Sequence, residues 1–560
     1  MKSETQAKPK IEFEPDTIII GHGLAGLVAA YELTQVGKKV LLLDQETEAN
    51  LGGQAFWSLG GLFMIDTPQQ RRMGIRDSYE LAYQDWMGSA GFDREEDYWP
   101  RKWAEAYLQF ADGEKYRYVR ELGISFFPVV GWAERGDGSA SGHGNSVPRF
   151  HISWGTGTGV VAPFVRKARE AEEKGLLRFG WRHRVTELIR SKHLIEGVRG
   201  ELLAADEKLR GEKTNREVIG QFEYKAPNTI IASGGIGANL DLIRQNWPAR
   251  LGKAPQKMIF GVPDYVDGRM LGIAEKAGAH MINRDRMWHY TEGIHNWNPI
   301  WTNHAIRILP GPSSIWLDAR GNRLPAPFLP GFDTLGTLQH LMQTGHEYSW
   351  FILTQKIIKK EFALSGSEQN PDLTNRDYRK LLNRLGSTRA PGPVEDFKEK
   401  GQDFIVADNL EELVQRMNEL SGDHLLEYGK ILETISSRDR ELNNKFSKDT
   451  QINYLHSTRK YLGDRLIRTA KPHKILDPKN GPLIAVRLNL LTRKTLGGLQ
   501  TDLNGQVFDP SGNLISGLFA AGEASGFGGG GMHGYRALEG TFLGGCIFSG
   551  RQAGRHIASL

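Results

Sequence analysis

The sequence predicts an α/β protein in which a second domain interrupts the first. Apolar segments run into glycine turns at three separated places, residues 17–26, 228–235 and 518–523. Between the second and the third of these places, over residues 290–470, loops rich in proline and glycine lie beside segments that predict polar amphipathic helices. A chain of 560 residues is also too long for one ordinary hydrophobic core. We therefore expect a discontinuous first domain, residues 1–289 and 471–560, and an inserted α+β domain, residues 290–470.

The first glycine segment predicts a βαβ unit that binds the ADP half of a dinucleotide. An apolar run ends at Gly21, a helical pattern follows, and a second apolar run ends at Asp44. Gly21 permits the tight turn, Gly23 lets the backbone approach a pyrophosphate, and Gly26 lets the helix pack closely on the strand. The helix N-terminus supplies amide donors to the phosphates. Asp44 can accept both hydroxyl groups of the adenosine ribose, which completes a Rossmann-like site.

The later segments extend this domain. A glycine-rich stretch over residues 51–61 follows the βαβ unit. Residues 228–235 and 518–523 each predict a buried strand that runs into a glycine turn, and residues 541–553 predict a closing helix. The C-terminal part therefore repeats the pattern of a buried strand followed by a glycine turn that is typical of the first domain.

Composition excludes several kinds of partner. The formal net charge is +5, and no basic run is interleaved with aromatic residues, so we expect no nucleic-acid partner. No stretch of about 18 apolar residues predicts a transmembrane helix, and residues 1–15 lack the apolar segment of a signal peptide, so we expect a cytoplasmic location.

Metal-based electron chemistry is not expected. The single cysteine, Cys546, cannot form an internal disulfide or help to hold an iron–sulfur cluster. His289, Glu292 and His295 do not stay on one helical face, so we expect no metal site there. Any electron transfer must use an organic cofactor or a partner.

Three glycine-rich segments, residues 18–26, 231–239 and 517–525, together with the pair Gly60–Gly61 and the motif Thr495–Gly498, resemble a superfamily of FAD-binding flavoproteins. This superfamily includes fumarate reductases, succinate dehydrogenase flavoprotein subunits and 3-ketosteroid dehydrogenases. The loops 310–314 and 327–333 resemble a ketosteroid-dehydrogenase-like subgroup. The resemblance covers most of the chain and is weakest across the insertion. It implies FAD as the cofactor and a capping domain inserted into a Rossmann-like FAD-binding domain.

The resemblance also implies which residues contact FAD. Gly522 and Glu523 would contact the pyrophosphate and the ribityl hydroxyls, and Val185 would offer its backbone to adenine. The first amides of the last helix would face the flavin edge where negative charge gathers on reduction. The full expected set is Gly21, Gly23, Leu24, Ala25, Gly26, Asp44, Gln45, Gly52, Gly53, Gln54, Ser58, Gly60, Gly61, Val185, Ala232, Ser233, Gly234, Gly522, Glu523, Thr541, Phe542 and Leu543.

One departure from the superfamily concerns the link to FAD. Some members attach FAD covalently to a histidine six positions before the paired glycines. This chain has Gln54 at that position. Because the glutamine amide is not a nucleophile, we expect FAD to be bound non-covalently.

The catalytic candidates fall into two groups. Steroid dehydrogenases carry a tyrosine six residues before the threonine that begins the last helix, and Tyr535 stands six residues before Thr541. In that family the tyrosine hydroxyl and a backbone amide, here that of Glu539, bind the substrate ketone. The family's proline–glycine run after the tyrosine is absent here. Tyr290, at the change of domains, is a further candidate as a proton acceptor.

The second group would bind an anion. Lys494, His151 and Arg536 lie near positions at which fumarate reductases place substrate-binding cations. The segment that carries the fumarate reductases' proton-donating arginine contains no arginine here after Arg323. Reduction of a dicarboxylate needs both fixed cations and a proton donor, so this chemistry is disfavoured.

These observations predict an FAD-dependent dehydrogenase that acts on a CH–CH bond next to a carbonyl, with a ketosteroid-like small molecule as substrate. FAD would exchange a hydride with one carbon while a side chain handles the proton on its neighbour. The alternatives are a fumarate-reductase-like enzyme for an unsaturated carboxylate and an electron-carrying flavoprotein subunit of a complex. Substrate identity, direction, electron acceptor and oligomeric state stay open.

Overall fold

The computed structural model describes residues 13–380, 387 and 389–560. Its first sheet joins strands from distant parts of the chain in the order β6-β2-β1-β10-β22-β8-β7. β1 pairs in parallel with β2 and β10, and β10 pairs in parallel with β22, so the three predicted glycine segments meet in one sheet. The expected α/β fold is confirmed. The strands are β1 (Thr17–Ile20), β2 (Val40–Leu43), β6 (Leu177–Gly180), β7 (His183–Ser191), β8 (Leu194–Leu203), β9 (Val218–Lys225), β10 (Asn228–Ile231), β21 (Gln506–Phe508) and β22 (Leu514–Ala520).

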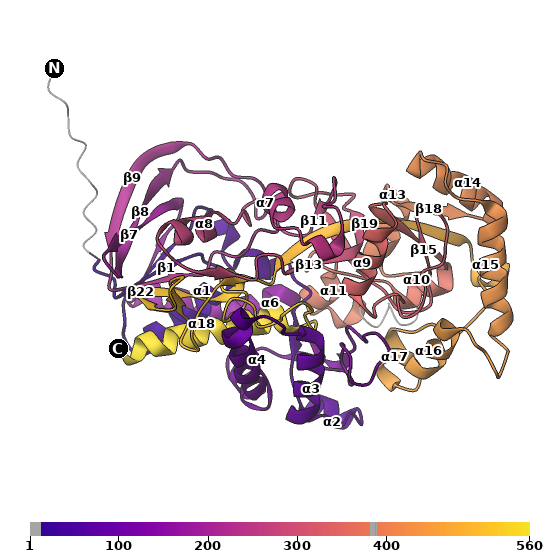
Figure 1. The fold of residues 1–560 in the computed structure, drawn as a ribbon, viewed down its shortest axis with the longest axis horizontal. Helices are drawn as coiled ribbons and strands as arrows, with labels where there is room; N and C mark the ends of the chain where they lie inside the picture. The colour runs from indigo at the N-terminus through magenta and orange to yellow at the C-terminus, as the bar shows by residue number, and fades with distance from the viewer. Residues whose placement is uncertain (1–12, 381–386, 388) are drawn as a thin grey trace, which may run out of the picture.

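Helix α1 (Leu24–Gln35) packs against α6 (Thr156–Glu173) and α18 (Thr541–Ser559) beside this sheet (Figure 1). Glycines allow α1 and α18 to approach closely. A Cβ atom on Gly550 would lie 2.4 Å from the Ala25 carbonyl oxygen. The last helix of the chain is therefore held directly against the helix that follows the first strand.

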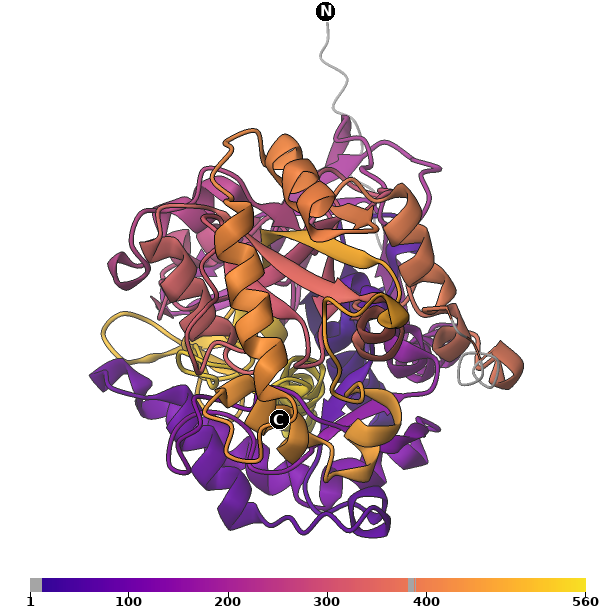
Figure 2. The same ribbon diagram turned by 90° about the vertical axis from the view of Figure 1, so that its right-hand side faces the viewer.

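The second sheet has its own hydrophobic core, in which Trp350 and Phe351 are fully buried. Its order is β15-β16-β19-β13-β14-β17, with β11 and β18 also paired to β19. The long strand β19 runs between the two halves of the molecule (Figure 1), while α14 and α15 cover the far end (Figure 2). The strands are β11 (Ile259–Phe260), β13 (Met287–His295), β14 (Ala305–Leu309), β15 (Ile315–Asp318), β16 (Tyr348–Thr354), β17 (Ala363–Leu364), β18 (Phe404–Ala407) and β19 (Leu483–Thr495).

The helices around the second sheet are α9 (Thr334–Gln343), α10 (Gln355–Glu361), α11 (Pro371–Thr374), α13 (Gly392–Lys400), α14 (Leu410–Ser421), α15 (Tyr428–Glu441), α16 (Thr450–Thr458) and α17 (Leu462–Ile467). β13 begins before residue 290 and β19 lies after residue 470. The second sheet therefore includes strands that begin before, or lie after, the expected insertion. The domain boundaries at residues 290 and 470 stay a prediction.

A layer of helices lies below the first sheet in the view of Figure 1. Trp103 of α4 donates its indole N–H to the Asp502 carbonyl at 2.9 Å, which joins this layer to the C-terminal part of the chain. The elements are β3 (Gly61–Phe63), α2 (Pro68–Arg72), α3 (Tyr79–Ala90), α4 (Tyr98–Ala111), α5 (Glu114–Glu121), β4 (Phe126–Gly131) and β5 (Phe150–Ser153).

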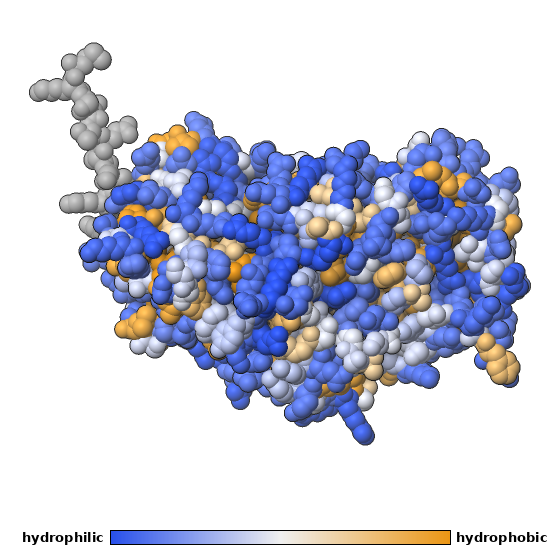
Figure 3. Space-filling model, viewed as in Figure 1, coloured by the Kyte–Doolittle hydropathy of each residue, from blue (hydrophilic) through white to orange (hydrophobic). Residues whose placement is uncertain are grey.

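The surface in the view of Figure 3 is mostly hydrophilic, with small separate apolar patches. Among the described residues, no helix combines the length and the apolar character needed to cross a bilayer. The remaining short elements are α7 (Leu240–Gln245), α8 (Arg269–Lys276), β12 (Met281–Ile282) and β20 (Gly498–Leu499).

Candidate active site

A deep cavity lies at the carboxyl ends of β1, β10 and β22, the edge at which parallel sheets bind ligands. It spans about 1690 Å³ including its open mouth. Its lining runs from the glycine turns of the first sheet to Tyr290 and Arg307 of the second sheet, so both sheets contribute to one cavity. The expected FAD-contacting residues that line it are Gly21, Gly23, Leu24, Ala25, Asp44, Gln45, Gly53, Gln54, Ser58, Gly60, Gly61, Val185, Ala232, Ser233, Gly234, Gly522, Glu523, Phe542 and Leu543.

Three expected residues lie just behind this wall. A Cβ on Gly26 would lie 2.1 Å from the Gly21 carbonyl oxygen, so Gly26 permits the close contact between α1 and the turn. Gly52 pairs with Gly23 in an isolated bridge. The Thr541 hydroxyl lies 2.9 Å from a ring nitrogen of His533, away from the lining. These residues shape the wall rather than face the cavity.

The turn after β1 fits a pyrophosphate. Gly21 has a φ of +107°, and a Cβ there would lie 2.5 Å from the Ala232 carbonyl oxygen. Both facts require glycine at this position. Gly23 is the N-cap of α1, and Leu24 and Ala25 in the first turn line the cavity. The positive end of the α1 dipole is therefore available to a phosphate.

The carboxylate of Asp44 is oriented by backbone donors. One oxygen accepts from the His22 amide at 3.0 Å, and the other accepts from the Glu46 amide at 2.9 Å. Asp44 follows β2 at the cavity wall. Each oxygen keeps a second lone pair, so the carboxylate can also accept the two ribose hydroxyls.

Gln54 lies between two charged side chains of the cavity wall. Its amide oxygen accepts from the Lys494 ammonium at 2.5 Å, and its amide nitrogen donates to Glu523 at 2.6 Å. The second Glu523 oxygen accepts from the Thr495 amide at 2.8 Å. Burial lowers the pKa of Lys494, while Glu523 acts to raise it. Lys494 is therefore tied to an acid through Gln54 instead of standing free.

A cluster of charged side chains around Tyr290 also reaches the cavity; we call it the Tyr290 cluster, and it is formed by Tyr290, Arg307, Glu539, Glu134 and Glu292. The Tyr290 hydroxyl donates to Glu539 at 2.9 Å. Arg307 donates to the same oxygen at 2.6 Å, and its guanidinium lies 3.7 Å from the centre of the Tyr290 ring. Tyr290, Arg307 and Glu539 all line the cavity.

Two further acids surround the guanidinium of Arg307. Glu134 lies 3.7 Å and Glu292 3.8 Å from it. Burial raises the pKa of Glu134 to about 8, although Arg307 opposes the shift. Burial likewise raises the pKa of Glu292, again against Arg307. One buried cation thus faces three carboxyl groups, and burial favours protonation of two of them.

Arg307 was not predicted from the sequence, and Glu539 was predicted only for its backbone amide. One signal was available for Arg307, because it is the single charged residue in the apolar strand β14. No comparable signal marks the Glu539 carboxylate. It reaches Tyr290 only because the loop before α18 folds against β13.

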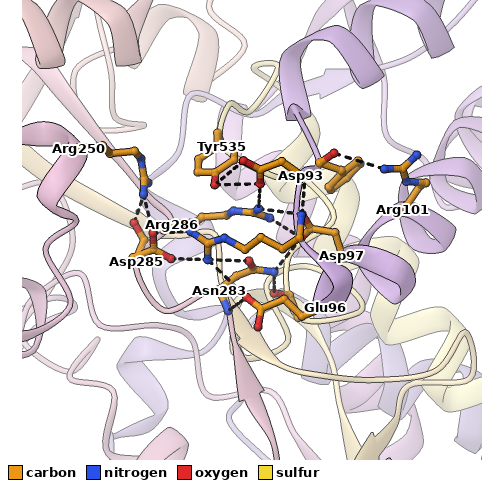
Figure 4. Close-up of polar contacts among 12 residues, drawn as sticks. Asp93, Glu96, Asp97, Arg101, Arg250, Asn283, Asp285, Arg286 and Tyr535 are labelled. Carbon is orange, nitrogen blue, oxygen red and sulfur yellow. Dashed lines mark hydrogen bonds and ion pairs between the residues drawn. The ribbon is translucent and has the colours of Figure 1, made fainter.

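Tyr535 does not line the cavity, and its expected role is not supported by the geometry. Figure 4 shows it at a separate polar cluster. Its hydroxyl donates to Asp93 at 3.0 Å, and the Arg286 guanidinium lies 4.1 Å from its ring centre. Arg250 and Arg94 also face the ring, and both pair with Asp285. The departure from the family's proline–glycine run after Tyr535 coincides with this different orientation.

The expected anion clamp of Lys494, His151 and Arg536 is not assembled. His151 is fully buried in β5, where its ring bonds the Arg149 carbonyl at 2.9 Å and the Thr67 hydroxyl at 2.8 Å. Burial lowers the pKa of His151 to about 4, so it is neutral near pH 7. Arg536 lies 3.7 Å from Asp333. Of the three, only Lys494 lines the cavity.

Comparison with known proteins agrees with the glycine-built cavity. The FAD binding domain family matches residues 16–543. A KsdD-like steroid dehydrogenase of Mycobacterium tuberculosis is 58% identical over 97% of this chain and 95% of that protein. One from Mycolicibacterium smegmatis is 59% identical over 95% of this chain and 96% of that protein.

Among solved structures, a 3-ketosteroid delta1-dehydrogenase from Sterolibacterium denitrificans aligns with a TM-score of 0.69 at 15% identity, over 98% of this chain and 99% of that one. This likeness shows the fold. The match to the FAD binding domain family confirms FAD as the cofactor. The chain belongs to the FAD binding domain family, among the KsdD-like steroid dehydrogenases, and is an FAD-dependent oxidoreductase.

Proposed function

We propose that this protein dehydrogenates a ketosteroid-like substrate at a CH–CH bond next to the carbonyl. The names of its relatives point to steroids. The observation that carries the proposal is that the Tyr290 cluster and the glycine-lined FAD cradle open into one cavity. Phe150, Val262 and Phe527 also line it and offer apolar surface to a steroid.

The cofactor residues have distinct proposed tasks. Gly21, Gly23 and the first turn of α1 would hold the pyrophosphate, and Asp44 would hold the adenosine ribose. The N-terminus of α18, whose Phe542 and Leu543 line the cavity, would face the flavin ring. FAD, when bound, supplies the hydride acceptor for the chemistry.

Tyr290 would handle the proton. In this mechanism the Tyr290 oxygen takes a proton from the carbon next to the substrate carbonyl as its own proton passes to Glu539. Burial raises the pKa of Tyr290, so a free tyrosinate is disfavoured. A transfer coupled to Glu539 avoids that species, because the phenol exchanges one proton for another. Arg307 would orient the Glu539 carboxylate, as the third member of a triad orients the base.

Anaerobic mixing of the oxidised enzyme with candidate substrates tests this function. We expect 4-androstene-3,17-dione or its ring-saturated form to bleach the flavin absorbance, and succinate to leave it unchanged. Bleaching by succinate alone would contradict the steroid assignment. It would favour the carboxylate alternative, for which the structure offers only Lys494 of the expected clamp.

We also propose that FAD is non-covalent. Both ends of the Gln54 amide are engaged, by Lys494 and Glu523, at the position that other members use for attachment. Acid precipitation should release the yellow colour into the supernatant. Colour that stays in the pellet would refute this prediction.

The expected cytoplasmic location also stays a proposal, which cell fractionation can test. The electron-carrier alternative would gain support only if the protein copurified with an iron–sulfur or cytochrome subunit.

A further inference from the structure

Strand β19 contains a bulge where it passes the cavity. Trp288 pairs with Lys494 and Tyr290 pairs with Leu491, so one residue of β13 lies opposite two residues of β19, Thr492 and Arg493. Consecutive side chains on a regular strand point to opposite faces. Arg493 and Lys494 nevertheless both line the cavity. Bulges re-aim side chains in this way and are frequent next to active sites.

The cations of the cavity differ in how they are neutralised. Arg307 is bonded to Glu539, and Lys494 is joined to Glu523 through Gln54. Arg493 instead donates to the Ser365 hydroxyl at 3.3 Å. In the part of the chain that the structure describes, no carboxylate lies within 4.0 Å of the Arg493 guanidinium. Among these residues Arg493 therefore makes no ion pair at contact distance, although its charge opposes the burial that raises the pKa of Glu368.

Ser365 fixes the place of this cation. Its hydroxyl also accepts from the backbone amide of Arg307 at 2.9 Å, so it links Arg493 to the Tyr290 cluster. Tyr290 faces Leu491, two residues before Arg493 on the same strand. Burial raises the pKa of Tyr290, and the charge of Arg493 opposes that shift, as expected for near neighbours.

We propose that Arg493 binds the substrate's carbonyl oxygen and stabilises the negative charge that develops there. This inference rests on the proposed dehydrogenation. When Tyr290 removes the proton, the electrons of the broken C–H bond move into the adjacent C–C bond and the carbonyl becomes an enolate. As the carbonyl re-forms, a double bond forms between the two carbons, and the hydride on the second carbon would pass to FAD. A fixed cation at the oxygen lowers the cost of the first step. Arg493 thus takes the task first expected of Tyr535, which lies outside the cavity.

Arg493→Gln tests the proposal. We expect flavin reduction by 4-androstene-3,17-dione or its ring-saturated form to slow by about 10²–10³-fold, as for loss of one oxyanion donor. Arg493→Lys should recover part of the loss because it keeps the charge. Arg487→Gln is the matched control, since Arg487 lies on the same strand, pairs with Asp403 at 3.2 Å and does not line the cavity. It should stay within about threefold of wild type.

A binding experiment separates this inference from the proposed function. The wild type should bind the 3-ketosteroid more tightly than its 3-deoxy analogue, and Arg493→Gln should lose that preference. If ketosteroids never reduce the flavin but the preference depends on Arg493, the proposed function fails while the contact to oxygen stands. If the wild type is reduced and Arg493→Gln reacts equally fast, the function stands and this inference is overturned. If Arg493→Gln does not fold, Ser365→Ala can be used instead, because it keeps the Arg493 cation and removes the hydroxyl to which Arg493 donates. An unchanged rate of flavin reduction and an unchanged preference for the 3-ketosteroid in this variant would overturn the inference.

Discussion

Tyr290 and Tyr535 make similar contacts, yet only Tyr290 lines the cavity. Each hydroxyl donates to a carboxylate, at 2.9 Å to Glu539 and at 3.0 Å to Asp93. An arginine lies over each ring, at 3.7 Å for Arg307 on Tyr290 and at 4.1 Å for Arg286 on Tyr535. Contacts alone therefore do not distinguish a catalytic tyrosine from a structural one, and it is access to the cavity that makes Tyr290 the candidate.

Exposure is the second difference between the two sites. The side chain of Asp93 is 63% exposed, whereas that of Glu539 is 15% exposed. Water therefore screens the contacts of Tyr535 and leaves those of Tyr290 strong. The same chemical groups thus form a structural contact near the surface and a candidate proton path in the cavity.

Substitution of the two tyrosines should separate them most clearly. Tyr290→Phe keeps the ring and removes the hydroxyl that would accept the proton. We expect flavin reduction to slow by about 10³-fold, within the range for loss of a general base. Tyr535→Phe should change the rate by less than about threefold, because its hydroxyl contacts Asp93 near the surface. Stopped-flow absorbance under anaerobic conditions measures both.

FAD content and melting temperature serve as controls for these two variants, since neither change removes apolar volume. A slower Tyr535→Phe than Tyr290→Phe would reverse the comparison. It would restore Tyr535 as the leading catalytic residue.

The same contrast explains what the sequence could and could not predict. The turn at Gly21 and the helix that follows are local, so spacing and residue type sufficed to predict a strand, a tight turn and a helix N-terminus. The Tyr290 cluster is not local. Glu539 and Tyr290 are 249 positions apart in the chain and meet only across the cavity. Tyr535 is predicted from its spacing to Thr541. Spacing along the chain does not determine the direction in which a side chain points when a glycine, here Gly534, directly precedes it.

Removal of an arginine from each cluster should affect stability unequally. Arg307→Met leaves Glu539, which is only 15% exposed, without its cation, and loss of one partner of a buried ion pair costs about 3–5 kcal/mol. Arg250→Met removes a half-buried partner of Asp285 near the surface, where such pairs contribute about 0–1 kcal/mol. Thermal unfolding of the FAD-loaded proteins compares them. Equal losses of melting temperature would mean that Arg307 in the Tyr290 cluster contributes no more to stability than Arg250 in the polar cluster around Tyr535.

The smallest expected effect is a pH dependence of the stability between pH 5 and pH 8, which arises from Glu134 of the Tyr290 cluster. Burial raises the pKa of Glu134 from 4.5 to about 8 in the folded protein. Between these values the unfolded chain has released the proton while the folded chain keeps it. The unfolded state therefore binds fewer protons, and this residue makes the free energy of unfolding fall as pH rises from about 4.5 to about 8.

Glu134→Gln removes this titration but keeps an acceptor for the Thr334 hydroxyl, which donates to Glu134 at 2.7 Å. We therefore expect the melting temperature of the variant, relative to wild type, to rise steadily between pH 5 and pH 8. A constant difference over that range would show that Arg307 holds Glu134 ionised throughout. The cluster would then carry one more negative charge near pH 7, and Glu539 would compete with Glu134 for the same cation. In that case Arg307 would face both carboxylates, and the orientation of Glu539, on which the proton path from Tyr290 depends, would need a second cation.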